Sequence, residues 1–197
     1  MKKILCLILL LIVTGCTIVR IDTIDINNII SVVLSKDNKM ANQHGKGYKY
    51  YIPRGVTYVD TTGYNEKLYS NGYYYFIYID AVSYYHQVDF DYKVDENAKF
   101  SRKIEVNDKT GYLEINQSEL GYYIEFVYNY AKIEALVAEK DVADIVLKAS
   151  YILSTIQFND KVIELLLRDD YFANREEVYN IFEPKKETDN FLRYEDE

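Results

Sequence analysis

The sequence is poor in the residues that most often build metal sites. Its 197 residues include two cysteines, two histidines and no tryptophan. Zinc sites usually combine histidine with further histidine or cysteine, and here His44 and His86 lie far apart in the chain. Asp89 and Asp91 follow His86 closely, but a calcium loop needs a glycine that this segment lacks. We therefore expect no metal and no cofactor, and interpret residues 86–91 as a solvated loop.

The sequence signatures of common hydrolases are also missing. There is no Gly-x-Ser-x-Gly elbow, no phosphate-binding glycine loop and no His-Glu-x-x-His motif. Glycosidases need two carboxylates that face each other, whereas neighbours in a strand point to opposite faces. The sequence therefore predicts no catalytic residues. Acidic neighbours are nevertheless abundant: Asp89/Asp91, Asp95/Glu96, Asp169/Asp170 and Glu176/Glu177.

Basic residues are outnumbered by acidic ones, with 23 lysines and arginines against 31 aspartates and glutamates. The formal net charge is -8, and loss of Lys2 and Lys3 by processing would make it more negative still. Nucleic acids reward clustered lysine and arginine, so we expect no nucleic-acid partner. The same balance disfavours spreading over anionic lipid headgroups.

The N-terminus has the features of an export signal. Lys2 and Lys3 precede an apolar run over residues 4–13. A transmembrane helix needs about 20 apolar residues, so this run has the length of a signal-peptide core instead. The boundary Val13-Thr14-Gly15-Cys16 resembles the lipobox of bacterial lipoproteins. The alternative is an ordinary buried helix with two chance cysteines.

The lipobox resemblance implies cleavage before Cys16 and a diacylglyceryl group on its thiol. Two acyl chains anchor a protein stably, which predicts a lipid anchor at the outer, extracytoplasmic face of the cell membrane. Cys6 would leave with the signal and Cys16 would be modified, which excludes disulfides and thiol catalysis. The abundance of tyrosine, isoleucine, lysine and asparagine, with their AT-rich codons, is typical of a low-GC Gram-positive source.

Hydrophobic periodicity predicts helices at both ends of the domain and strands between them. We expect helices over residues 25–34, 140–155 and 160–167, with a last turn or two over 175–182. Residues 35–47 read as a loop. Strands are expected over residues 48–52, 56–61, 66–70, 73–79, 100–106, 112–115, 121–128 and 131–137. Turn signals lie at Asn71-Gly72, at residues 107–111 and at Asn129.

These elements predict an α+β fold of two layers. An antiparallel sheet of about seven strands would pack against the long C-terminal helix and a shorter N-terminal helix. In the last strand, alternation places Ala131 and Ile133 on the core face and Lys132 and Glu134 on the opposite face, as in a half-buried strand. The expected organisation is a signal peptide over residues 1–15, then anchor, tether and short helix over 16–47. A single domain follows over 48–182 and a charged flexible tail over 183–197.

Two segments carry a second resemblance. One is Tyr48-Lys-Tyr-Tyr-Ile-Pro53-Arg-Gly55, and the other is Ala149-Ser-Tyr-Ile-Leu-Ser-Thr-Ile-Gln-Phe158. Together they resemble the PsbP/DcrB type of sheet-and-helix domain, in which a strand ending in Pro-basic-Gly begins the sheet. That family consists mostly of lumenal or periplasmic accessory proteins and lipoproteins, and the resemblance concerns the fold rather than the function.

Tyrosine is the outlier, with 22 residues. In the strand over residues 73–79, one face carries Tyr74, Phe76 and Tyr78, and we expect Tyr69, Tyr112 or Tyr123 from neighbouring strands beside them. Such a face could bind a protein or glycan of the envelope, with Tyr84 and Tyr85 on the rim. The competing interpretation is cross-strand packing that only stabilises the sheet.

Three functions are therefore open. The first is a non-catalytic accessory lipoprotein that binds a partner through the tyrosine face. The second is a cell-envelope hydrolase whose carboxylates are distant in sequence. The third is a lipoprotein that captures a solute, which would require an apolar pocket.

Overall fold

The computed structural model describes residues 21–168. The predicted signal peptide, Cys16, the predicted turns over 175–182 and the tail over 183–197 lie outside the described residues. No helix within residues 21–168 is both long enough and apolar enough to cross a membrane.

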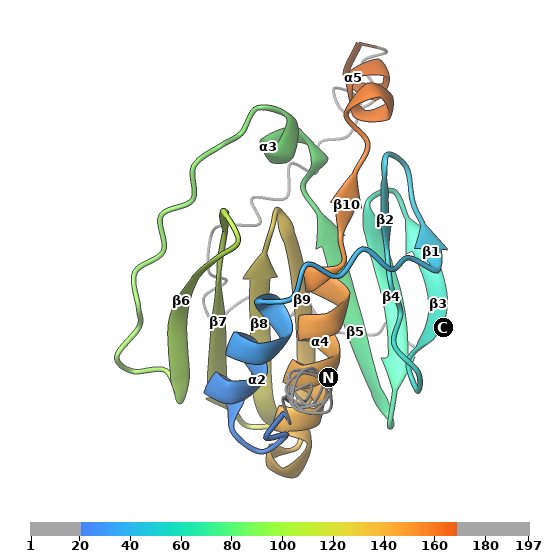
Figure 1. Ribbon diagram of the computed structural model, residues 1–197. Helices are drawn as coiled ribbons and strands as arrows, with labels where there is room; N and C mark the ends of the chain where they lie inside the picture. The colour runs from blue at the N-terminus through green and yellow to red at the C-terminus, as the bar shows by residue number, and fades with distance from the viewer. Residues whose placement is uncertain (1–20, 169–197) are drawn as a thin grey trace, which may run out of the picture.

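A seven-stranded antiparallel sheet forms the body of the domain, in the order β3-β4-β5-β9-β8-β7-β6. Two helices, α2 (Ile26–Leu34) and α4 (Val142–Ser154), lie side by side on one face of it (Figure 1). The predicted two-layer α+β fold is thus confirmed. The strands are β3 (Thr57–Thr62), β4 (Asn65–Ser70), β5 (Tyr73–Ile79), β6 (Phe100–Val106), β7 (Lys109–Ser118), β8 (Gly121–Tyr128) and β9 (Ala131–Val137).

Two-residue turns, each beginning with an asparagine, set the register between neighbouring strands of the sheet. Asn71 and Gly72 both have positive φ, 52° and 88°, and join β4 to β5. Asn107 and Asp108 join β6 to β7 with φ of 54° and 57°. Such pairs form two-residue hairpin turns whose twist matches that of the strands. The predicted five-residue turn over 107–111 is therefore too long, because β7 already begins at Lys109.

The core lies between the helices and the sheet. Ile145, Ala149 and Ile152 of α4 are fully buried against Ile124 and Ile133 of the sheet, as the helical stripe in the sequence predicts. Helix α2 begins after Asp25, whose carboxylate accepts a hydrogen bond from the backbone N–H of Asn27 at 2.9 Å.

A second, three-stranded sheet covers one side of the domain. It pairs β1 (Gln43–His44), β2 (Tyr48–Tyr50) and β10 (Gln157–Phe158) in the order β1-β2-β10. Residues 48–52 therefore do not begin the main sheet, and the loop predicted over 35–47 contains β1. The Tyr48 and Tyr50 hydroxyls both donate to the buried Glu66 carboxylate of β4, which joins the two sheets.

Two short helices complete the domain at the end where α4 finishes (Figure 1). Helix α3 (Ala81–Tyr85) begins after Asp80 and packs near α5 (Asp160–Arg168). The sequence analysis predicts no helix between residues 79 and 100, whereas Tyr84 and Tyr85 end α3. The Asp80 carboxylate accepts the Ser83 N–H at 2.8 Å and thereby caps this helix.

Candidate functional site

The predicted tyrosine face is only partly exposed. On β5, Tyr74, Phe76 and Tyr78 point away from α4, and their exposure decreases along the strand. Tyr74 is 38 % exposed, Phe76 is half-buried and Tyr78 is buried. Of the flanking residues, Tyr112 is also buried, and Tyr69 is 40 % exposed.

The exposed remainder forms a small aromatic patch near the edge of the sheet, made of Tyr69 and Tyr74 beside Lys67. The two rings lie 5.2 Å apart between centroids, and the Lys67 Nζ is 4.1 Å from the centre of the Tyr74 ring. A lysine ammonium over a tyrosine face is a favourable cation–π arrangement.

Tyr84 and Tyr85 are not part of this patch. Tyr74 lies near the start of β5, whereas α3 follows the end of the strand. The Tyr84 ring stacks on Phe158 at 3.9 Å, and its hydroxyl donates to Asp160 at 2.8 Å. Burial, together with Asp160, raises the pKa of Tyr84 to about 12. Tyr84 thus fastens α3 to β10 and α5, while Tyr85 remains 38 % exposed.

Among residues 21–168, no group of three or more histidine, cysteine, aspartate or glutamate side chains is arranged to hold a metal ion. His86 ends α3, and His44 lies in β1.

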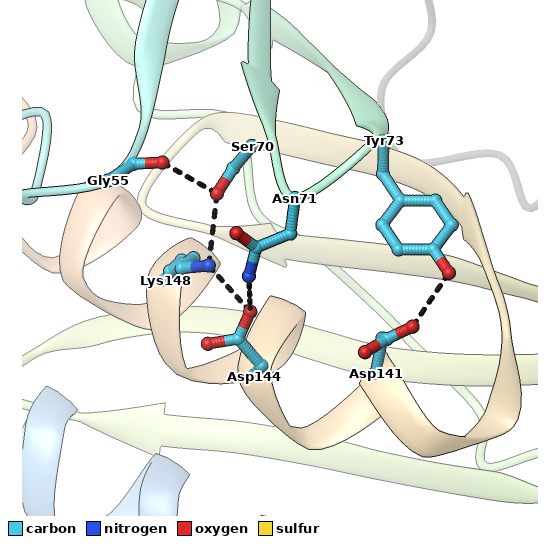
Figure 2. A network of polar contacts seen from close by, with 7 residues as sticks. All are labelled: Gly55, Ser70, Asn71, Tyr73, Asp141, Asp144 and Lys148. Carbon is cyan, nitrogen blue, oxygen red and sulfur yellow. Dashed lines mark hydrogen bonds and ion pairs between the residues drawn. The ribbon is translucent and has the colours of Figure 1, made fainter.

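Lys148 of α4 contacts Ser70, the last residue of β4. A serine beside a lysine can be a nucleophile beside its base. Lys148 Nζ donates to Ser70 Oγ at 3.0 Å, but it also pairs with Asp144 at 2.5 Å (Figure 2). The Ser70 hydroxyl in turn donates to the Gly55 carbonyl at 2.7 Å. The Ser70 hydroxyl thus donates to a backbone carbonyl rather than to a base, and Lys148 is shared between Ser70 and Asp144, which is not the arrangement of a nucleophile activated by a base.

The same cluster has a clear structural role. Asn71, in the β4–β5 turn, donates to Asp144 at 3.0 Å, and the Tyr73 hydroxyl donates to Asp141 at 2.7 Å (Figure 2). These contacts fasten the hairpin to the first turn of α4.

The sheet face opposite the helices carries a feature that the sequence analysis missed, a row of three glutamates. Glu114 of β7 lies directly opposite Glu125 of β8, and Glu125 lies directly opposite Glu134 of β9. All three are buried. Like charges placed directly opposite each other destabilise a strand pair, so the row needs compensating partners.

One lysine and three tyrosines provide those partners. Lys132 Nζ lies 2.6 Å from Glu134 Oε1 and 3.7 Å from Glu125 Oε2. The Tyr112 hydroxyl donates to Glu125, and the Tyr92 hydroxyl donates to Glu114. Burial and the nearby Glu134 carboxylate raise the pKa of Tyr123.

Lys132 and Glu134 are therefore not on a solvated face, as alternation along β9 had indicated. They are 3 % and 2 % exposed. Lys132 Nζ lies 5.2 Å from the centre of the Tyr78 ring. At the Glu114 end of the row, the residues that join α3 to β6 supply a cover that is remote in sequence. Tyr92 stacks on Tyr112 at 4.0 Å between ring centres, and Phe90 stacks on Tyr112 at 5.4 Å.

The pKa of the buried Glu125 carboxyl lies close to neutral pH. Burial raises the pKa of Glu125 to about 7, with Glu134 and Glu114 adding to the rise and Lys132 and Tyr112 opposing it. A carboxyl that retains its proton near pH 7 could serve as a general acid. However, a glycosidase must bring its two carboxylates to the substrate, and the buried row offers no such approach.

An apolar groove lies at the end of the domain where α2 and α4 begin, here called the N-terminal pole. Its volume is about 710 Å³. Part of its lining is polar or lies at the rim, and this part comprises Thr23, Ile24, Lys99, Glu139, Lys140, Ala143 and Asp144. The apolar part of the lining comes from α2, α4 and the adjoining strands: Ile26, Phe100, Ile115, Tyr122, Val142 and Leu147.

A smaller hollow of about 340 Å³ lies at the opposite end of α2. It is lined by more polar residues, among them Lys36, Asp37 and Asn107. The Asn107 amide donates to the Leu34 carbonyl at 2.9 Å and closes the end of α2.

Comparison with family models, with curated proteins and with solved structures finds no match to this chain. The resemblances to lipoproteins and to the PsbP/DcrB type therefore stay predictions from the sequence.

Proposed function

We propose that the chain is an extracytoplasmic accessory lipoprotein, held to the membrane through Cys16, that acts by binding rather than by catalysis. Its binding site is the groove at the N-terminal pole. The groove is the observation that carries the proposal, because it combines volume, an apolar lining and an opening to the surface. Volumes of about 300–1,000 Å³ are usual for sites that bind small molecules, and 710 Å³ falls within that range.

The lining favours an amphipathic ligand. Apolar side chains such as Phe100 and Leu147 offer contact to a hydrocarbon group, while Lys99 and Lys140 offer positive charge. The competing function, a hydrolase that uses carboxylates, is disfavoured because Glu114, Glu125 and Glu134 are buried and committed to internal partners.

The groove can be tested by filling it. Ala143 lines it, so Ala143→Trp places an indole in the space that a ligand would occupy. The probe is the anionic apolar dye 1-anilinonaphthalene-8-sulfonate, titrated into the purified mature protein. We expect saturable binding to the wild type and a loss of affinity of about tenfold in Ala143→Trp, equivalent to about 1.4 kcal/mol.

Lys36→Trp is the matched control, because it introduces the same side chain at the rim of the smaller hollow. It should bind the dye as the wild type does. Equal binding by all three proteins, or no binding by the wild type, would contradict the proposal.

The aromatic patch of Tyr69, Tyr74 and Lys67 supports a second candidate, binding of an envelope protein or glycan. The observation that favours it is the exposure of both tyrosines beside a lysine. Cross-linking in cells, followed by isolation of wild type and of Tyr69→Ala/Tyr74→Ala, tests this candidate. A partner that is captured equally by both forms would rule the patch out.

A further inference from the structure

The two most exposed large apolar side chains of the described residues lie at the same end of the domain. Ile24 and Leu120 are each 84 % exposed, whereas the next, Leu165, is 59 % exposed. Ile24 lines the groove at the N-terminal pole, and Leu120 lies in the β7–β8 turn, two residues before the groove residue Tyr122. Single exposed apolar residues are common, but a pair that flanks an apolar groove indicates an interaction surface.

The length of chain between Cys16 and the domain limits what this surface can face. Ile21 packs against the core and is only five residues beyond Cys16. An extended chain spans at most about 3.6 Å per residue, so five residues reach about 18 Å. If Cys16 carries lipid in the membrane, the N-terminal pole must lie close to the bilayer.

The lining of the groove carries two lysines, although the chain as a whole is strongly negative. Lys99 and Lys140 line the groove, and neither forms an ion pair with another described residue. Of the two acids that line the groove, Asp144 is paired with Lys148, while Glu139 forms no ion pair with a described residue. Near the groove, Asp25 caps α2, Asp141 accepts the Tyr73 hydroxyl, and the exposed Glu119 lies next to Leu120. The chain as a whole is strongly negative, so its other faces are repelled by anionic headgroups.

We propose that the N-terminal pole docks on the membrane, with Ile24 and Leu120 in the interface and an acyl chain of a bilayer phospholipid in the groove. This rests on the proposed function in one respect, that Cys16 holds the chain at the membrane. Lys99 and Lys140 then lie at the level of the phosphate groups, as basic side chains beside an apolar surface do in interfacial proteins.

The cysteine content of the chain makes the test simple. After processing, an acylated Cys16 leaves no free thiol, so one introduced cysteine can be labelled alone. Glu119→Cys places a polarity-sensitive fluorophore beside Leu120, and Leu165→Cys places it on α5 at the opposite end (Figure 1). The lipidated proteins are reconstituted into vesicles of phosphatidylcholine and phosphatidylglycerol that contain a lipid-borne nitroxide quencher.

We expect the label at position 119 to be blue-shifted and to lose most of its emission to the quencher. The label at position 165 should behave as in water. Adding Ile24→Asp and Leu120→Asp to Glu119→Cys should abolish the quenching without lowering the melting temperature, because both side chains are exposed. Quenching that is absent at 119, equal at both positions, or unchanged by the aspartates would overturn the proposal.

Failure of the anchor is measured separately, by the mass of the N-terminal peptide. If Cys16 carries no lipid, the labelled protein with Cys16→Ser is mixed with the same vesicles. Quenching at 119 alone would then support docking without the anchor, and its absence would overturn docking as well. Vesicles of phosphatidylcholine alone distinguish attraction by Lys99 and Lys140 from insertion of Ile24 and Leu120.

Discussion

Replacing Glu125 with glutamine should remove part of the pH dependence of folding. Glu125 is 4 % exposed, and its pKa is raised from 4.5 to about 7. An acid whose pKa rises on folding stabilises the folded state below its ordinary pKa, and that contribution is lost as the pH rises through the folded-state value. At about 1.4 kcal/mol per pH unit, the interval from 4.5 to about 7 corresponds to about 3.5 kcal/mol.

Glutamine has nearly the same shape as glutamate but cannot ionise, so the variant tests the effect of the charge alone. Its amide oxygen still accepts the Tyr112 hydroxyl, and Lys132 keeps Glu134 at 2.6 Å. Wild type and Glu125→Gln should therefore have similar stability near pH 4.5. Near pH 8 the variant should be more stable by up to about 3.5 kcal/mol, because it has no buried charge to form.

Urea unfolding at intervals between pH 4.5 and 8 measures this difference, with circular dichroism and tyrosine fluorescence as probes. The control is Glu105→Gln, since Glu105 is 63 % exposed and pairs with Lys103 at the surface. It should leave the pH dependence as in the wild type. A constant difference in unfolding free energy between Glu125→Gln and wild type over this range would refute the reasoning.

Three further substitutions test the anchor, the core and the sheet. Cys16→Ser should accumulate as an uncleaved precursor without acyl chains, and normal removal of residues 1–15, read by mass spectrometry, would disprove the lipobox assignment. Ile145→Asp puts an unpaired charge at a fully buried position and should cost several kcal/mol, so near-wild-type thermal stability would contradict the packing of α4. Gly111→Ala places a Cβ against the backbone of Val127 across β7 and β8, and should cost about 1–3 kcal/mol in urea unfolding, whereas Gly72→Ala meets no atom there and is strained only by its positive φ.

The elements that the sequence predicts well are those with a strong local signal. The stripe of α4, with Ile145 and Ile152, repeats at helical spacing and faces one layer only. Asn71-Gly72 fixes its hairpin because few residue pairs adopt positive φ twice in succession. Helix α3 has a weaker signal, because five residues are too few for a hydrophobic period.

The glutamate row could have been predicted in part from the turns between the strands, because turn positions fix which residues lie opposite each other. A tight turn at Asn129 and Tyr130 places Glu125 opposite Glu134, and the β7–β8 turn places Glu114 opposite Glu125. Register alone could therefore have predicted the row. Alternation could not predict the burial of Glu114, because Tyr92, which donates to it, and Phe90, which stacks on the same Tyr112 ring as Tyr92, are distant in sequence.

Both faces of the main sheet are largely covered, so little of the sheet surface is available to bind a partner. The helices cover one face, and the tyrosine–glutamate network closes the middle of the other. Eight tyrosines of the described residues are buried in the domain, most of them in the main core cluster. Much of the tyrosine content is thus explained by packing and by hydroxyls that hold buried carboxylates. What remains accessible is the patch around Tyr74 at one edge and the groove at the N-terminal pole. Because the groove is the larger of the two hollows and lies within reach of Cys16, substitutions there should alter membrane association, whereas those at Tyr69 and Tyr74 should leave it unchanged.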